Sequence, residues 1–133
     1  MSHTRSTLRI AATALTAAVT VPLLVAGPAL ANDDDVIRRG GCSGGTDWKV
    51  KASPEDGRIE VEGEIDSNNN GQTWRWRLRH NGSLSAKGTA TTGGRSGSFE
   101  VRRVLVDLSG PDTFVFRARN VGSGEVCRGT VTF

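Results

Sequence analysis

The chain is poor in the residue types that most often build catalytic and metal sites. Among its 133 residues there are two cysteines, two histidines, one methionine and no tyrosine. His3 belongs to the N-terminal leader described below, which leaves His80 as the sole histidine of the mature protein. With one histidine and no C-x-x-C pair, zinc sites and Cys–His catalysis are not expected, and no cofactor is predicted.

The chain after residue 31 also lacks long apolar runs and any sustained 3.6-residue hydrophobic period. A helix of any size is therefore not expected there. Short alternating stretches are separated instead by clusters of Gly, Asn, Asp and Pro, which recur about every ten residues. This punctuation is typical of an all-β sandwich or barrel.

The first 31 residues have the order of features of a secretory signal peptide. Arg5 and Arg9 precede an apolar stretch over residues 10–26, and an Ala-x-Ala motif ends at Ala31. We expect cleavage after Ala31, secretion, and no transmembrane segment in the mature form. The formal net charge is +3, and it falls close to zero without the two leader arginines, so a nucleic-acid partner is not expected.

Three segments are expected: a signal peptide over residues 1–31, a flexible N-terminal tail over 32–41 and a β-sandwich domain over 42–133. The only two cysteines, Cys42 and Cys127, lie near the two ends of the domain. Since export exposes them to an oxidising compartment, we expect them to form a disulfide. Closing so long a loop stabilises the fold by about 4–5 kcal/mol on the chain-entropy model.

The alternating stretches predict seven strands in the domain. Pro54–Gly57 and Asn81-Gly82 are turn signals between strands. Arg102-Arg103 interrupts the alternation of its strand, which suggests a β-bulge. The seven expected strands are residues 46–53, 58–65, 72–80, 83–91, 98–107, 113–121 and 125–133.

Two of these strands carry opposite charges. Three glutamates alternate along 58–65 and three arginines along 72–80. If the strands pair as a hairpin, each glutamate faces an arginine; if they lie in opposite sheets, the charges form two separate outer faces. Acid–base catalysis needs carboxylates in different environments, so a solvated face is expected in either case. The six residues are Glu60, Glu62, Glu64, Arg75, Arg77 and Arg79.

Several short motifs occur together along the chain. They are the Ala-x-Ala leader, Cys-Ser-Gly followed by Asp-Trp, Asn-Gly-Gln-Thr-Trp, Gly97–Arg103 and Gly124–Cys127. In these motifs the chain resembles small secreted actinobacterial proteins of uncharacterised function with an immunoglobulin-like β-sandwich domain. Seven strands with a tryptophan on the third also suit that fold. The positions of the two cysteines differ from those in antibody domains, where they lie on the second and sixth strands. Here they lie before the first expected strand and on the last. The resemblance implies no activity.

One segment matches the first half of a calcium loop. Asp66-Ser67-Asn68-Asn69-Asn70-Gly71 fits D-x-N-x-N-G, with Asp66, Asn68 and Asn70 as candidate ligands. The twelfth position of such a loop normally supplies a bidentate acid, and here it is Arg77. A loop between strands, rich in residues that tolerate positive φ, is the preferred interpretation.

The run Gly41–Gly45 has the letters of a nucleophile elbow around Ser43. Such an elbow needs a strand before it and a helix after it, with a histidine and an acid as partners. Here the only candidate base is His80, and a strand is expected after the motif. No catalytic residue is predicted, and small residues around a disulfide cysteine explain the run.

Trp74 and Trp76 share one face of their strand, as aromatic sugar-binding platforms do. Tryptophans at this spacing are more often part of a core, and their exposure distinguishes the two hypotheses. The expected function is a secreted, non-enzymatic module that binds an extracellular protein or a cell-envelope glycan. The alternatives are a carbohydrate-binding module that uses Trp74 and Trp76, and a small secreted hydrolase.

Overall fold

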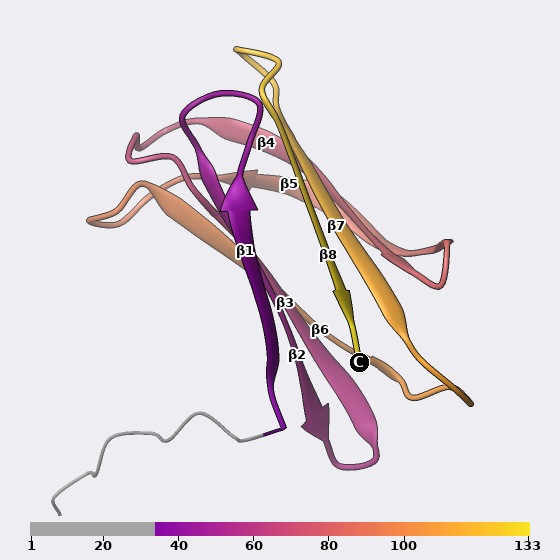
Figure 1. The fold of residues 1–133 in the computed structure, drawn as a ribbon. Coiled ribbons are helices and arrows are strands. Elements are labelled where there is room, and N and C mark those ends of the chain that lie inside the picture. The colour runs from indigo at the N-terminus through magenta and orange to yellow at the C-terminus, as the bar shows by residue number, and fades with distance from the viewer. Residues whose placement is uncertain (1–33) are drawn as a thin grey trace, which may run out of the picture.

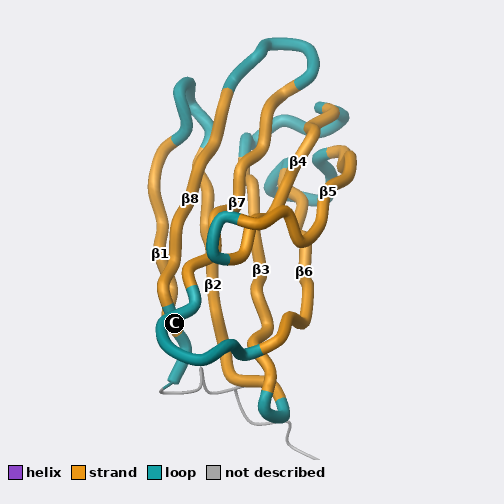
Figure 2. The backbone as a smooth tube through the Cα atoms, turned by 90° about the vertical axis from the view of Figure 1, so that its right-hand side faces the viewer, coloured by secondary structure: helices purple, strands orange, loops and turns teal. Residues whose placement is uncertain are grey.

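The computed structural model describes residues 34–133, and these residues form two layered antiparallel sheets without a helix (Figure 1). Sheet A has the order β1-β2-β3-β6, and sheet B has the order β5-β4-β7-β8. Figure 2 shows that β1 lies beside β8 on one side of the molecule and that β5 and β6 flank the other. The strands are β1 (Val36–Gly41), β2 (Asp47–Glu55), β3 (Arg58–Asp66), β4 (Thr73–His80), β5 (Ser83–Thr91), β6 (Ser98–Val106), β7 (Thr113–Asn120) and β8 (Val126–Thr132).

The predicted signal peptide over residues 1–31 lies outside the described residues. Within residues 34–133, no helix is long and apolar enough to cross a membrane. The all-β prediction is confirmed, and β2 to β8 follow the seven predicted strands to within two residues at each end.

The prediction of a flexible tail was wrong over Val36–Gly41, which forms β1 and raises the number of strands to eight. β1 pairs with β2 in an antiparallel register in which Gly40 lies opposite Trp48. A Cβ atom on Gly40 would lie 2.6 Å from the Trp48 indole, so glycine lets the ring pack on this strand. The segment is short, basic and at a sheet edge, and such a strand depends on its neighbour more than on its own apolar pattern.

The predicted bulge at Arg102-Arg103 was also wrong, because β6 pairs with β3 in an unbroken register. Arg103 instead points inward at the edge of the sandwich, with its guanidinium 5.1 Å from the centre of the Trp76 ring. A cation above an indole is attracted to the ring, and it also protects an edge strand from pairing with another chain. The irregularity lies between β4 and β5, at Leu78 and Arg79.

β3 and β4 lie in opposite sheets, which settles the two alternatives for the charged strands. The glutamates of β3 therefore do not face the arginines of β4. The inner faces of the two sheets form the core, which includes the fully buried Trp74, Phe114 and Phe116. Gly63 of β3 makes room for Phe116 of the opposite sheet, since a Cβ there would lie 2.6 Å from the phenyl ring.

The predicted disulfide is confirmed. Cys42 in the β1–β2 loop is bonded to Cys127 on β8, across 85 residues of sequence, and so joins the two sheets. Glu125 supports the same corner, because its carboxylate accepts hydrogen bonds from the Gly44 and Thr46 amides, each 3.0 Å long. The open side of the sandwich, between β5 and β6, has no covalent tie.

Candidate functional site

The outer face of sheet B carries seven cationic side chains. Along each strand, exposed or half-buried outward positions alternate with buried inward ones. The four strands of this sheet contain no aspartate or glutamate. We call this surface the basic face. Its cations are Arg75, Arg77, Arg79, Lys87, Arg117, Arg119 and Arg128.

Four of these cations form a continuous line across the sheet. Lys87 lies opposite Arg77, Arg77 opposite Arg117, and Arg117 opposite Arg128, so every strand contributes one cation. Neighbouring strands are about 4.8 Å apart, and like charges placed directly opposite each other destabilise a sheet. We call these four residues the cation row. A second opposed pair, Arg75 and Arg119, lies beside it.

The charges of the basic face are not compensated within residues 34–133. All five ion pairs of the described residues lie elsewhere. Arg79 donates one hydrogen bond, 3.1 Å long, to the carbonyl oxygen of Gly82 in the adjoining turn. The guanidinium groups are thus left with donors free for an external anion.

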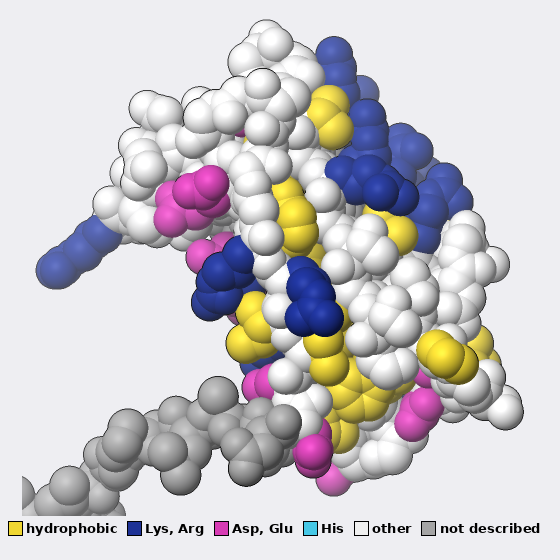
Figure 3. All heavy atoms as spheres, viewed as in Figure 1, with side chains coloured by type: hydrophobic (Ala, Val, Ile, Leu, Met, Phe, Trp, Pro, Cys, Tyr) yellow, Lys and Arg dark blue, Asp and Glu magenta, His cyan; other side chains and the backbone are white. Residues whose placement is uncertain are grey.

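Two shallow hollows flank the cation row. One, of about 500 Å³, is lined on its charged side by Arg75, Arg119 and Lys87. The other, of about 340 Å³, is lined by Arg79 and Arg128. Arg77 and Arg117 line both hollows and form the ridge between them. Figure 3 shows dark blue side chains gathered on the right-hand side of the view, over β7 and its neighbours in sheet B.

The outer face of sheet A has a different arrangement, in which cations of the neighbouring strands contact the glutamates of β3. Like charges also lie opposite each other on this face, at Arg39 and Lys49 and at Glu64 and Glu100. Lys49 contacts Glu64, and the ammonium of Lys51 lies 3.2 Å from the Glu62 carboxylate. The prediction of a solvated glutamate face needs correction at Glu60, which is buried and contacts Arg102 of β6. β3 lies between two strands that bear long side chains, and these side chains cover its carboxylates.

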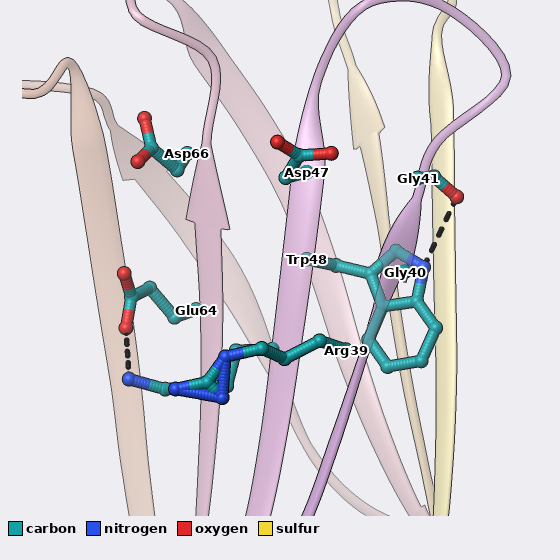
Figure 4. A pocket seen from close by; sticks show the side chains of 8 residues that line it. Arg39, Gly40, Gly41, Asp47, Trp48, Glu64 and Asp66 are labelled. Atoms are coloured by element: carbon teal, nitrogen blue, oxygen red, sulfur yellow. Dashed lines mark hydrogen bonds and ion pairs between the residues drawn. The ribbon is translucent and has the colours of Figure 1, made fainter.

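A third hollow, of about 510 Å³, lies at the end of sheet A that includes the start of β2 and the end of β3. Two contacts join residues that line this hollow: Lys49 donates to the Glu64 carboxylate, and the Trp48 indole nitrogen donates to the Gly41 carbonyl oxygen (Figure 4). The carboxylates of Asp47 and Asp66 point away from the Lys49–Glu64 contact (Figure 4). Its charges are of mixed sign, so this hollow has no strong preference for ligands of either charge.

The two tryptophans proposed as a sugar platform are part of the core. Trp74 is fully buried and Trp76 is 6% exposed. Arg103 covers the Trp76 ring, and Gly88 of β5 lies against its other edge. A platform needs an exposed ring face, so the structure does not support carbohydrate binding through these two residues.

The proposed calcium segment is the connection between sheets A and B. Asp66 ends β3, and its carboxylate accepts a hydrogen bond from the Asn68 amide. Asn68 has a positive φ of 57°, which asparagine tolerates in such a turn. Asn70 is exposed, and Arg77 lies on the outer face of sheet B. Among the described residues, no three His, Cys, Asp or Glu side chains are grouped so that they could hold a metal ion.

Ser43 and His80 lie at opposite ends of sheet B. The Ser43 hydroxyl accepts a hydrogen bond from the Val126 amide, whereas His80 pairs with Phe114, which faces Val131. Val126 and Val131 are separated by about 17 Å of extended strand. Ser43 and His80 therefore do not form a nucleophile–base pair. Ser43 instead holds the loop next to Cys42 against the start of β8, close to the disulfide.

His80 is buried and contacts Asp112, a pairing that the sequence did not suggest. The imidazole stacks on Phe114 with 4.6 Å between ring centres. Asp112 also accepts hydrogen bonds from the Leu108 amide and the Asn81 side chain, so it ties the β6–β7 loop to the β4–β5 turn. Burial raises the pKa of the Asp112 carboxyl, but the hydrogen bonds from His80 and Leu108 and the charge of His80 bring it below its ordinary value of 3.8.

Sequence reasoning found the alternating arginines of β4 but missed the basic face as a whole. Arg117 and Arg119 show the same alternation on β7, and Arg128 continues it on β8. That signal was present, but only the strand order places these residues beside one another. Comparison of the chain with models of protein families, with curated proteins and with solved structures gave no match.

Proposed function

We propose that the mature protein is an exported, non-enzymatic binding module whose basic face holds an anionic partner outside the cell. The cation row carries this proposal. It places four like charges in direct opposition, and no side chain of the described residues compensates them. Opposed cations destabilise the free sheet, and a bound anionic ligand that neutralises their charges would account for their presence.

Export is supported by the sequence of the first 31 residues and by the chemistry of the cysteines. The leader has the charge, apolar run and cleavage motif of a secretory signal. The Cys42–Cys127 disulfide persists in an oxidising compartment and would be reduced in most cytosols. Both features agree with a partner in the extracellular space or the cell envelope.

The strand order supports an immunoglobulin-like assignment with one added edge strand. Without β1, sheet A has the order β2-β3-β6 and sheet B the order β5-β4-β7-β8. β2, β3 and β6 then correspond to strands A, B and E of an immunoglobulin domain, and β4, β7 and β8 to C, F and G. In such sandwiches a sheet face is a common docking surface, but the fold alone does not name the partner.

The proposed function is tested with the mature protein and a labelled polyanion, heparin, titrated at several salt concentrations. A variant with Arg77→Gln, Arg117→Gln and Arg128→Gln removes three charges from the cation row. We expect its affinity to fall at least 10-fold, which corresponds to about 1.4 kcal/mol, and the salt dependence to become shallower.

The matched control removes three charges elsewhere. Arg39 and Arg58 lie on sheet A and Arg95 lies in the β5–β6 loop, and all three are exposed. The triple glutamine variant at these positions has the same net charge as the row variant and should bind nearly as the wild type does. Equal losses in the two variants, or no heparin binding at low salt, would contradict the proposed function.

A further inference from the structure

We infer that the anionic partner is a linear anionic glycan that lies across the strands of sheet B, along the cation row. This inference rests on the proposed function and adds to it the chemical class of the ligand and its direction. The glycan is one that carries carboxylate, sulfate or phosphate groups on its sugars, as cell-envelope polymers do.

The direction follows from the register. The cation row crosses all four strands, and its three strand-to-strand intervals of about 4.8 Å give a length of about 14 Å. The two hollows lie on either side of the row and share Arg77 and Arg117. A chain laid along the row would meet both central arginines and could place substituents in both hollows. A compact anion would occupy one hollow and leave one end of the row unpaired, which is Arg128 for the first hollow and Lys87 for the second.

The anionic groups of the ligand suit the residue types of the basic face. Six of its seven cations are arginines, and Lys87 is the exception. The planar guanidinium fork forms two parallel hydrogen bonds with carboxylate, sulfate or phosphate oxygens. A face built from arginine therefore favours ligands whose anions offer paired oxygens.

The neutral part of the ligand is indicated by hydroxyl groups that surround the cations. Threonines occupy outward positions on every strand of sheet B, and their hydroxyls both donate and accept hydrogen bonds, as sugar hydroxyls require. Thr89 lies two residues from Lys87 and Thr130 two residues from Arg128, so each end of the row has one. The six outward threonines are Thr73, Thr89, Thr91, Thr113, Thr130 and Thr132.

Other polyanions fit the basic face less well. The outward positions of sheet B include no aromatic residue, and Trp76, which borders the hollow of about 500 Å³, is only 6% exposed. The bases of a single-stranded nucleic acid would therefore find little ring surface on which to stack. The outward apolar residues, Leu84, Val115 and Val126, are scattered and do not provide the aromatic anchors at the centre of a protein interface. A glycan binds without stacked bases and without aromatic anchors.

The ligand class is tested with a panel of polymers at matched charge concentration and physiological salt. The panel contains polygalacturonate, heparin, oligo-dT, polyglutamate, vesicles with anionic lipid, and neutral dextran. We expect the two anionic glycans to bind at least 10-fold more tightly than the other members. The variant with Thr89→Val and Thr130→Val keeps the shape and charge of the face and should lose about 5-fold for the glycans, with no change for oligo-dT.

The direction is tested with two matched double variants on β4 and β7. Arg77→Gln with Arg117→Gln removes the centre of the row, and Arg75→Gln with Arg119→Gln removes the neighbouring opposed pair. Both remove two arginines, but we expect a loss of more than 10-fold in glycan affinity for the first and of about 3-fold for the second. Melting temperatures establish that each variant is folded.

The outcomes separate this inference from the proposed function. If all polyanions bind equally, or if oligo-dT, polyglutamate or the vesicles bind more tightly than the glycans, the glycan inference is overturned while the anion-binding function stands. If the two double variants lose equally, the placement along the row is overturned. If no member of the panel binds, the proposed function fails together with the inference.

Discussion

The outer faces of sheets A and B present charged side chains at the same alternating strand positions, but the partners of those charges differ. On sheet A, Lys49, Lys51 and Arg102 each contact a glutamate of β3. On sheet B, Arg77 and Arg117 face each other and are flanked by further cations. Sheet A thus pairs three of its cations with glutamates, whereas the cations of sheet B have no acidic partner among the described residues. The largest effect is expected in the framework that carries both faces, and three smaller effects test the difference between them.

The largest effect concerns the framework that both faces share. Asp112 is buried, contacts His80 and accepts a hydrogen bond from the Leu108 amide. Asp112→Ala should lower the free energy of unfolding by about 3 kcal/mol, since it leaves buried donors unpaired. Chemical denaturation measures the loss. Asp112→Asn keeps an acceptor oxygen and should lose less; equal losses would contradict the explanation by unpaired donors, because an uncharged acceptor would then give no rescue.

The same residue gives a pH dependence. Because the pKa of Asp112 in the folded protein lies below its ordinary value of 3.8, its carboxylate stabilises the fold above that pH. The contribution is lost as the pH falls through the lowered pKa. Denaturation midpoints measured from pH 6 to pH 2 should therefore fall more steeply for the wild type than for Asp112→Asn. Parallel profiles would contradict the assignment.

The second prediction reverses one charge in the centre of the cation row. Arg117→Glu would place an acid between Arg77 and Arg128, as Glu62 of sheet A lies between two cations. We expect heparin affinity to fall about 100-fold, or about 2.7 kcal/mol, while the free protein becomes more stable. If Arg117→Glu binds heparin as tightly as the wild type does, the unpaired cations of sheet B are not the binding surface.

The third prediction makes the opposite exchange on sheet A. Glu62→Arg would place a cation between Lys51 and Arg102 and so build a short row like that of sheet B. The free energy of unfolding should fall by about 1–2 kcal/mol, because partly buried like charges then face each other. Heparin binding through the basic face should stay unchanged. Stabilisation by this substitution would mean that opposed cations are tolerated on either sheet.

The smallest effect is the intrinsic cost of the cation row in the free protein. The variant with Arg77→Gln and Arg117→Gln should be more stable than the wild type by about 0.5 kcal/mol at low salt. Added salt screens the repulsion, so the difference in melting temperature between the two proteins should disappear near molar salt. A difference that does not change with salt would have another origin than charge.

Much of the local structure could be predicted because it depends on residues close in sequence. Alternation of apolar and polar side chains located seven strands, and Asn81-Gly82 marked the tight turn between β4 and β5. β1 could not be predicted in this way, since its six residues include two arginines and two glycines. Its formation depends on pairing with β2, a contact between different parts of the chain.

The candidate site was predictable only in part. The near-neutral charge of the chain after residue 31 argued against a nucleic-acid partner, but net charge averages over two faces with different composition. Arg75, Arg77 and Arg79 were identified as an outer face, yet their neighbours come from β5, β7 and β8. No rule of local spacing connects Arg77 with Arg117, because their contact depends on which strands share a sheet.

The sequence by itself determined the all-β class, most strand positions and the Cys42–Cys127 disulfide. These depend on side-chain alternation, on turn residues and on the presence of only two cysteines. The tertiary structure alone decided that β3 and β4 separate into different sheets, that Trp74 and Trp76 are buried, and that four cations align across sheet B. Alternation states which side chains share a face of one strand, whereas hydrogen-bonded pairing between distant strands decides which faces become one surface.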